Sequence, residues 1–114
     1  YERAEIDASV RRFGAPVFDK TGGRVMRIEE KPKRPKSPYA HVGFYLFDGR
    51  VFDIIRTLKP SARGQLEITD AVNAYIKNDS FRHAFVRGFW ADAGTFDSLM
   101  RAARWCERNA PRGT

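Results

Sequence analysis

Residues 39–60, YAHVGFYLFDGRVFDIIRTLKP, decide the fold class. The segment 39–47 is almost wholly apolar, which is typical of a strand that is covered on both faces. Asp48-Gly49 interrupts this run, and apolar residues then recur at helical spacing until Lys59-Pro60 ends the predicted helix. A strand followed directly by a helix favours a protein in which these elements alternate.

A β-hairpin is predicted upstream of this stretch. Residues 15–18 form its first strand, 19–23 contain the paired glycines of a turn, and 24–30 form the second strand. Alternation along the second strand places three residues on one face: Met26, Ile28 and Glu30.

The loop that follows the hairpin, residues 31–38, is extended and basic. It holds three of the six prolines of the chain, so no helix can form there. Because a residue before proline avoids the helical region, Pro32 is expected to hold Lys31 in an extended conformation.

Downstream, the pattern alternates again. A helix over 68–76 carries an apolar stripe, with Thr69 or Asp70 as its cap. A strand is predicted over 84–90, and Thr95 can cap a final helix. The inner stripe of that helix comprises Phe96, Leu99, Ala103 and Cys106. The order of elements indicates the α/β or α+β class.

Composition excludes some classes of protein and favours others. A chain of 114 residues with 42% hydrophobic residues is one domain with a real core. No apolar run reaches the ~20 residues of a membrane helix, no signal peptide opens the sequence, and the single cysteine excludes a disulfide framework. A cytoplasmic location is therefore expected. The net charge of +7 favours anionic partners.

Two groups of residues could bind a sugar phosphate. Glu30 and Lys31 meet where a strand enters a loop, and a carboxylate beside an ammonium suits hydroxyl groups and a phosphate respectively. His41, Gly43 and Tyr45 share one face of the predicted strand, where a glycine permits close approach of a ligand. A solvated charged turn and ordinary sheet packing are the alternative interpretations.

A third candidate lies between the strand 84–90 and the last helix. Trp90 and Asp92 stand at this junction, where α/β proteins bind ligands. The Asp92 carboxylate could hold a divalent metal, or it could serve the start of the helix.

These pieces together resemble the sugar nucleotidyltransferases, and among them those that make dTDP-glucose. The resemblance covers roughly residues 13–108, and its most specific part is residues 59–70, KPSARGQLEITD. It implies a Rossmann-like α/β fold with a mixed sheet flanked by helices. It also implies the transfer of a nucleotide from dTTP to glucose 1-phosphate, with release of pyrophosphate.

The resemblance assigns roles to the candidate residues. Lys31 is implied as the catalytic residue that holds the sugar phosphate, Trp90 as a neighbour of the site, and Asp92 as one of two acids that bind Mg²⁺. The residues implied to hold the sugar are Gly14, Glu30, His41, Gly43 and Tyr45. The sequence departs from the family pattern at His41, where a small apolar residue is usual.

The resemblance also indicates which part of an enzyme the chain corresponds to. Residues 1–114 are expected to form a single partial domain, the sugar-phosphate-binding C-terminal half of a catalytic domain whose nucleotide-binding half is absent. Such a piece is expected to be inactive alone, and the whole enzyme to be a homo-oligomer that binds neither nucleic acid nor membrane. The alternatives are an enzyme that uses UTP or CTP, and a non-catalytic sugar-phosphate-binding or regulatory module. A basic nucleic-acid-binding domain ranks below both, because no nucleic-acid signature is present.

Overall fold

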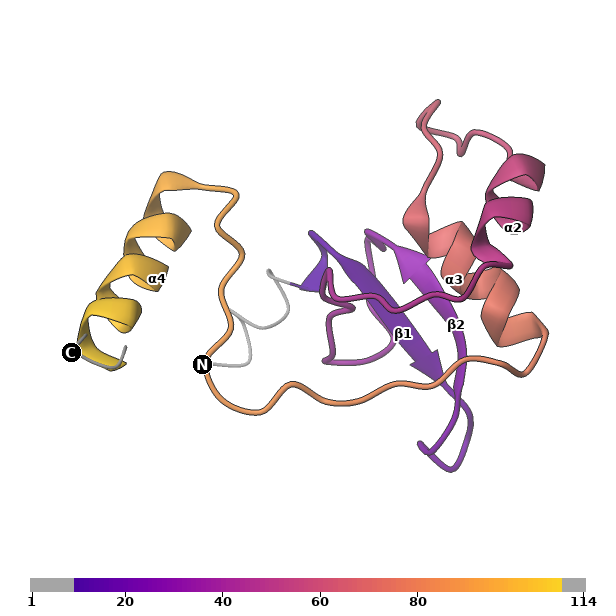
Figure 1. Ribbon diagram of the computed structural model, residues 1–114. Coiled ribbons are helices and arrows are strands. Elements are labelled where there is room, and N and C mark those ends of the chain that lie inside the picture. The colour runs from indigo at the N-terminus through magenta and orange to yellow at the C-terminus, as the bar shows by residue number, and fades with distance from the viewer. Residues whose placement is uncertain (1–9, 110–114) are drawn as a thin grey trace. The chain divides into compact units, whose positions relative to one another are not determined.

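The computed structural model describes residues 10–109, which fall into two compact units divided between Arg82 and His83 (Figure 1). Within residues 10–109, the first unit includes a two-stranded antiparallel sheet and the two helices labelled α2 and α3 in Figure 1, and the second includes the helix labelled α4.

The predicted hairpin is confirmed. β1 (Gly14–Phe18) pairs antiparallel with β2 (Val25–Glu30). The turn between them is held by Asp19, whose Oδ1 accepts hydrogen bonds from Thr21 Oγ1 at 2.8 Å and from the Gly23 amide at 3.1 Å. Within this turn Gly22 has a φ of 75°, a conformation that favours glycine.

A bulge changes which residues of β2 face the core. Val17 pairs with Arg27 and Phe18 pairs with Val25, so Met26 has no partner of its own in β1. The extra residue shifts the alternation: Val25 and Ile28 are both buried, whereas Met26 is 50% exposed. The prediction that Met26 and Ile28 share a face is therefore wrong.

The core forms where α3 (Ile68–Lys77) packs against β2 (Figure 1). Val72 and Ile76 of α3 join Val25 and Ile28 of β2 in one buried cluster. The predicted helix is thus confirmed. Its predicted caps are not, because Glu67 occupies the N-cap position and Thr69 lies within the first turn.

A side chain of α3 also completes the edge of β2. The Asn73 amide accepts a hydrogen bond from the Ile28 backbone N–H at 2.8 Å and donates one to the Ile28 carbonyl at 2.9 Å. These bonds satisfy backbone groups that would otherwise seek another strand.

The helix predicted after Asp48-Gly49 is also present. α2 (Val51–Thr57) begins where the Asp48 carbonyl accepts the Val51 N–H at 3.1 Å, and it ends before Pro60, as predicted. Val51 is its buried residue.

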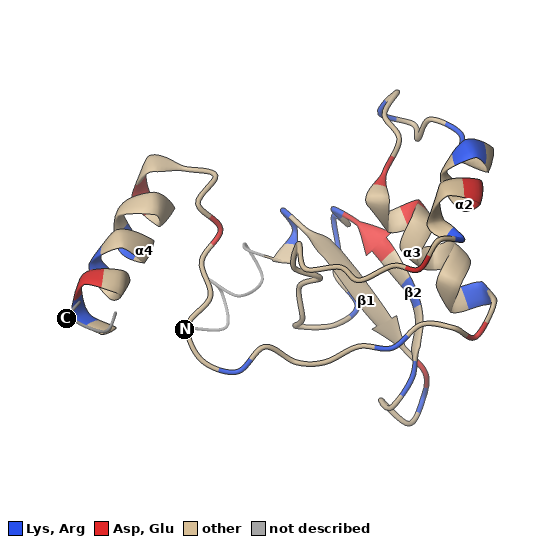
Figure 2. Ribbon diagram, viewed as in Figure 1, with Lys and Arg blue, Asp and Glu red and all other residues tan. Residues whose placement is uncertain are grey.

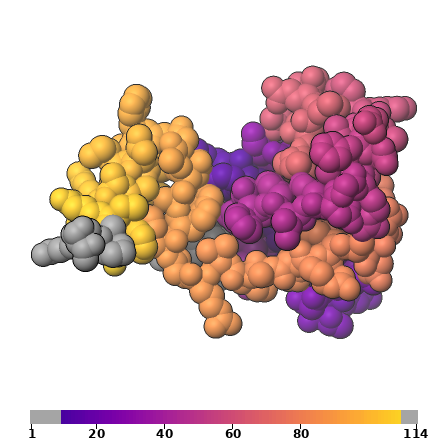
Figure 3. Space-filling model, in the orientation of Figure 1, coloured from indigo at the N-terminus to yellow at the C-terminus, as the bar shows by residue number. Residues whose placement is uncertain are grey.

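The two further strands predicted over 39–47 and 84–90 are not formed in the described residues. The β-pairing of segment 39–47 consists of one isolated bridge between His41 and Gly14 among the described residues. A strand needs a hydrogen-bonded neighbour and a cover for its apolar faces, and here Phe44 and Leu46 are 89% and 96% exposed. Figure 3 shows the segment around residue 45, coloured magenta, on the surface. The sheet among the described residues is therefore antiparallel rather than mixed.

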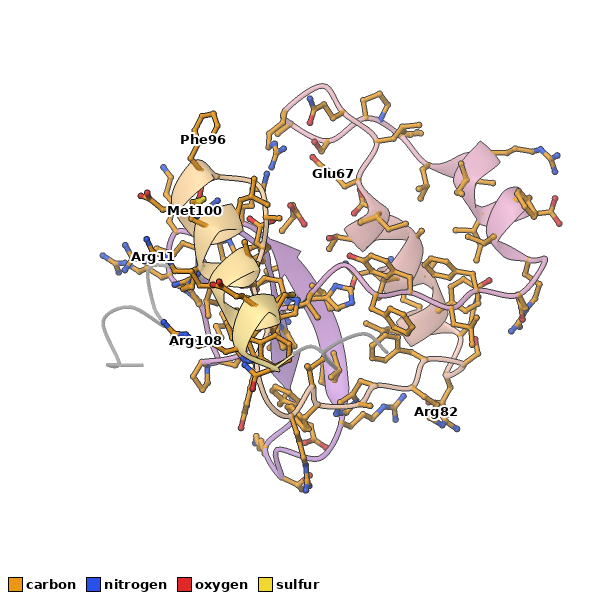
Figure 4. All side chains as sticks on the ribbon, turned by 60° about the vertical axis from the view of Figure 1, so that its left-hand side comes forward. Arg11, Glu67, Arg82, Phe96, Met100 and Arg108 are labelled. Carbon is orange, nitrogen blue, oxygen red and sulfur yellow. The ribbon has the colours of Figure 1, made fainter. Side chains whose placement is uncertain are left out.

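The second unit contains α4 (Phe96–Asn109). Thr95 is the predicted cap, and its Oγ1 accepts the Ser98 N–H at 3.3 Å while Ser98 Oγ accepts the Thr95 N–H at 3.2 Å. The predicted inner stripe is wrong for the described residues, because Phe96 and Leu99 are 89% and 49% exposed. Figure 4 shows Phe96 pointing away from the helix. Trp105 instead stacks on Phe89 with ring centroids 4.8 Å apart.

Candidate functional site

Several of the predicted site residues converge at one end of the hairpin. Gly14 lies opposite Glu30 across the β1–β2 pair, and its carbonyl accepts the His41 N–H at 2.6 Å. A Cβ at position 14 would lie 2.9 Å from Cγ2 of Ile28 and 3.4 Å from Cβ of His41. A glycine is therefore required for the chain at His41 to approach the sheet this closely.

His41 and Tyr45 form an aromatic wall beside Glu30. Their ring centroids are 5.0 Å apart, in an edge-to-face arrangement. Burial lowers the pKa of His41, and the negative charge of Glu30 opposes this effect. Burial and the same charge both raise the pKa of Tyr45. Both rings are consequently neutral near pH 7, and each can exchange hydrogen bonds with hydroxyl groups.

The Glu30 carboxylate lies at the acidic end of β2 (Figure 2). Residues of α3 and of the loop before it orient this carboxylate. Its Oε2 accepts a hydrogen bond from Thr69 Oγ1 at 2.5 Å, and its Oε1 lies 3.8 Å from Nη1 of Arg63. Thr69 is buried. From the sequence, Thr69 was predicted only as a possible cap, and the one signal that pointed to it was its place in the specific segment 59–70.

Residues 59–67 of that segment form a loop that leads into α3. Gly64 has a φ of 73°, and its N–H reaches the Ser61 carbonyl at 2.8 Å. Ser61 Oγ donates to Glu67 Oε1 at 2.9 Å, and Nε of Arg63 lies 3.5 Å from the same oxygen. The Arg63 guanidinium therefore lies between two carboxylates, those of Glu67 and Glu30.

Lys31 has a left-handed backbone, with a φ of 44°. The predicted extended conformation is wrong. The Lys31 N–H donates to the Phe13 carbonyl at 3.1 Å, which extends the hairpin by one bond, and the left-handed turn then directs the chain away from β2. Such a conformation is strained for a residue other than glycine, and strain of this kind is typical of functional sites. The side chain of Lys31 is exposed.

The remaining predicted residues are not part of this cluster. Gly43 lies on the exposed side of the segment between His41 and Tyr45, and a Cβ there would meet nothing within 4 Å. Trp90 and Asp92 belong to the second unit. Asp92 Oδ1 accepts the Gly94 N–H at 3.2 Å, in the turn that leads to α4.

Residues 10–109 contain neither a metal-binding cluster nor a membrane-spanning helix. This range gathers no group of three or more His, Cys, Asp or Glu side chains that could hold a metal ion. None of its helices has both the length and the apolar character needed to cross a bilayer.

Comparison with known proteins gives concordant matches. A family model described as "Nucleotidyl transferase" matches residues 4–109. The chain is 49% identical over 92 residues to a glucose-1-phosphate thymidylyltransferase of Actinoplanes sp., which covers 79% of this chain and 30% of the relative. It is 44% identical over 98 residues to the glucose-1-phosphate thymidylyltransferase of Neisseria meningitidis, with 84% and 34% covered.

A solved structure agrees with these matches. It is a "Putative Glucose-1-Phosphate Thymidylyltransferase from Bacillus anthracis in Complex with a Sucrose", which superposes with a TM-score of 0.77 at 46% identity. The match covers 91% of this chain and 41% of that one. The chain thus spans about a third of the length of the curated relatives it matches. The predicted resemblance and the α/β class are confirmed.

Proposed function

The chain belongs to the nucleotidyl transferase family, and from this premise we propose that it forms the sugar-phosphate-binding half of an enzyme that makes dTDP-glucose. The substrates are glucose 1-phosphate and dTTP, and the second product is pyrophosphate. The observation that carries the proposal is the convergence of Gly14, Glu30, His41 and Tyr45 at the start of the strained Lys31 turn.

Each residue has a role that follows from its chemistry. The backbone around Gly14 contacts the sugar, and the oriented Glu30 carboxylate accepts hydrogen bonds from its hydroxyl groups. His41 and Tyr45 form one wall of the sugar site, with Gly43 between them, and the family resemblance implies Trp90 as a further neighbour of the sugar. Lys31 pairs with the phosphate.

The reaction needs charge neutralisation more than a nucleophilic side chain. An oxygen of the sugar phosphate attacks the α-phosphorus of dTTP, a new P–O bond forms, and the bond to the β-phosphate breaks to release pyrophosphate. Two anions must approach each other in this step, and the Lys31 ammonium lowers their repulsion. No histidine or serine nucleophile is required.

The proposed cofactor is Mg²⁺, with Asp92 as one of its two acids. Mg²⁺ is usually held by one or two carboxylates together with substrate phosphates and water, so Asp92 fits as one ligand, and the described residues supply no group of three or more metal-binding side chains. The second acid would come from a nucleotide-binding half outside this chain.

The proposal extends to the whole protein. It would be a cytoplasmic homo-oligomer in which residues 1–114 are one partial domain, inactive without the nucleotide-binding half. Because base-reading residues would lie in that other half, UTP or CTP are the alternative nucleotides. A non-catalytic sugar-phosphate-binding module is the alternative from another class.

The test is pyrophosphate release by the full-length protein that contains this sequence. It is assayed with Mg²⁺ and glucose 1-phosphate, and with dTTP, UTP or CTP in turn. Lys31→Ala should lower turnover by ~10²-fold or more, because it removes a charge-stabilising group, and Asp92→Ala should abolish activity. Lys33→Ala is the matched control, since it removes an exposed cation of the same loop.

The outcomes separate the alternatives. Release with dTTP supports the proposal, and release with UTP or CTP alone changes the nucleotide. Silence with all three, combined with binding of glucose 1-phosphate, supports the non-catalytic module. Near wild-type turnover of Lys31→Ala would exclude the role given to Lys31.

A further inference from the structure

The aromatic wall of His41 and Tyr45 continues into the core as a row of aromatic rings. We call the rings of His41, Tyr45, Phe47 and Tyr75 the aromatic row. His41 meets Tyr45 edge to face at 5.0 Å, and Tyr45 stacks on Phe47 at 5.8 Å with planes 6° apart. Phe47 then contacts Tyr75 of α3 at 5.4 Å.

The aromatic row fixes a segment that the sheet holds only weakly. Among residues 10–109, the bridge from His41 to Gly14 is the β-pairing of segment 41–47. Tyr45 and Phe47 instead pack against the core cluster. The orientation of the His41 and Tyr45 rings therefore depends on ring contacts more than on backbone hydrogen bonds.

Tyr75 is the fixed end of this row. The residue is buried, and its hydroxyl donates to Asp48 Oδ1 at 2.8 Å. Arg50 holds the other carboxylate oxygen of Asp48 at 2.7 and 2.9 Å, and its guanidinium lies 5.5 Å from the centre of the Tyr75 ring. Tyr75 is thus held both at its hydroxyl and at its ring face.

We infer that Tyr75 is a positioning residue for glucose 1-phosphate: it sets, through Phe47, the orientation of the Tyr45 and His41 rings that face the sugar. This inference rests on the proposed function. Tyr75 itself does not touch the sugar, so it acts on binding and leaves the chemical step unchanged. Its loss should raise the KM for the sugar phosphate and spare both kcat and the KM for the nucleotide.

The kinetic test uses the full-length protein with two variants and a control. Tyr75→Leu removes the ring and should raise the KM for glucose 1-phosphate by about two- to tenfold, which is the range of one aromatic contact. Tyr75→Phe keeps the ring, removes the bond to Asp48, and should have a smaller effect of the same sign. Ala71→Gly lies on the same helix and destabilises it without removing a ring, so its KM should equal that of the wild type.

A spectroscopic test is independent of turnover. In the full-length protein, the NMR signals of His41 are assigned by comparison with a His41→Gln variant. Burial lowers the pKa of His41, which faces the charged Glu30 of β2 and the Tyr45 phenol. A loosened row exposes the imidazole, so its pKa should rise toward the ordinary value in the Tyr75 variants and stay unchanged in Ala71→Gly.

The outcomes keep the two proposals distinct. Wild-type sugar KM and an unshifted His41 pKa in Tyr75→Phe and Tyr75→Leu overturn the positioning role. If Ala71→Gly changes the KM or the His41 pKa as much as the Tyr75 variants do, the effect is general destabilisation, and the inference also fails. An inactive wild-type protein overturns the proposed function instead, and the His41 titration then decides the positioning role alone.

Discussion

A methyl group added at Gly14 tests the packing that brings His41 to the sheet. In Gly14→Ala the new Cβ would stand 2.9 Å from Cγ2 of Ile28, closer than such atoms can approach, and 3.4 Å from Cβ of His41. Ile28 is only 3% exposed and its Cγ2 is attached next to the backbone, so it cannot swing aside. Overpacking of this kind costs about 1–3 kcal/mol. In a domain of this size that corresponds to a fall in Tm of about 5–20 °C.

The measurement is thermal unfolding followed by circular dichroism. Gly49→Ala is the control, because a Cβ at position 49 meets nothing within 4 Å and the backbone there does not require glycine. That variant should melt within about 2 °C of the wild type or slightly higher. If Gly14→Ala melts together with Gly49→Ala, the close approach of the chain at His41 is refuted.

Three further predictions follow from single contacts. Asn73→Ala leaves the Ile28 N–H and carbonyl without their partner and should lower the free energy of unfolding in urea by about 2 kcal/mol; an unchanged urea midpoint would contradict the edge bonds. The hydrogen bonds from the Arg50 and Tyr75 side chains lower the pKa of Asp48 from 3.8 to about 2, so this carboxylate stabilises the fold above pH 4 and loses that effect as the pH falls from about 4 to about 2. Asp48→Asn should therefore flatten the acid limb of a stability–pH curve, and an identical limb would count against the interaction. Lys31→Gly relieves a left-handed backbone and should raise Tm by a few degrees while it removes turnover, because such strain costs about 1–2 kcal/mol; a lower Tm would show that the backbone at position 31 is not strained.

Local signals in the sequence were sufficient for part of the fold. The turn at Asp19, the helix from Ile68 and the Thr95 cap were all predicted correctly, because each depends on residues a few positions apart. The bulge at Met26 was not predictable in this way. The bulge is visible only in the pairing with the opposite strand, and the alternation of apolar and polar residues along β2 does not indicate it.

At the candidate site, too, prediction from the sequence failed where a feature depends on residues far apart in the chain. Gly14, Glu30, His41 and Tyr45 could be nominated from residue type and from the family resemblance. The hydrogen bond that orients Glu30 could not, because its partner Thr69 lies 39 residues further along the chain. The left-handed turn at Lys31 runs against the preference of a residue before proline, so local sequence rules could not predict it.

During synthesis of the chain, the hydrogen bonds between Asn73 and Ile28 can form only some time after the hairpin has been made. The hairpin is local and can form as soon as it leaves the ribosome, but Asn73 follows Ile28 by 45 residues. At about 5–20 residues per second, translation of that interval takes about 2–9 s. For those seconds Val25 and Ile28 have no helix to cover them. The nascent hairpin is then an apolar surface with an open strand edge, a state in which chaperones bind and neighbouring nascent chains can pair with it.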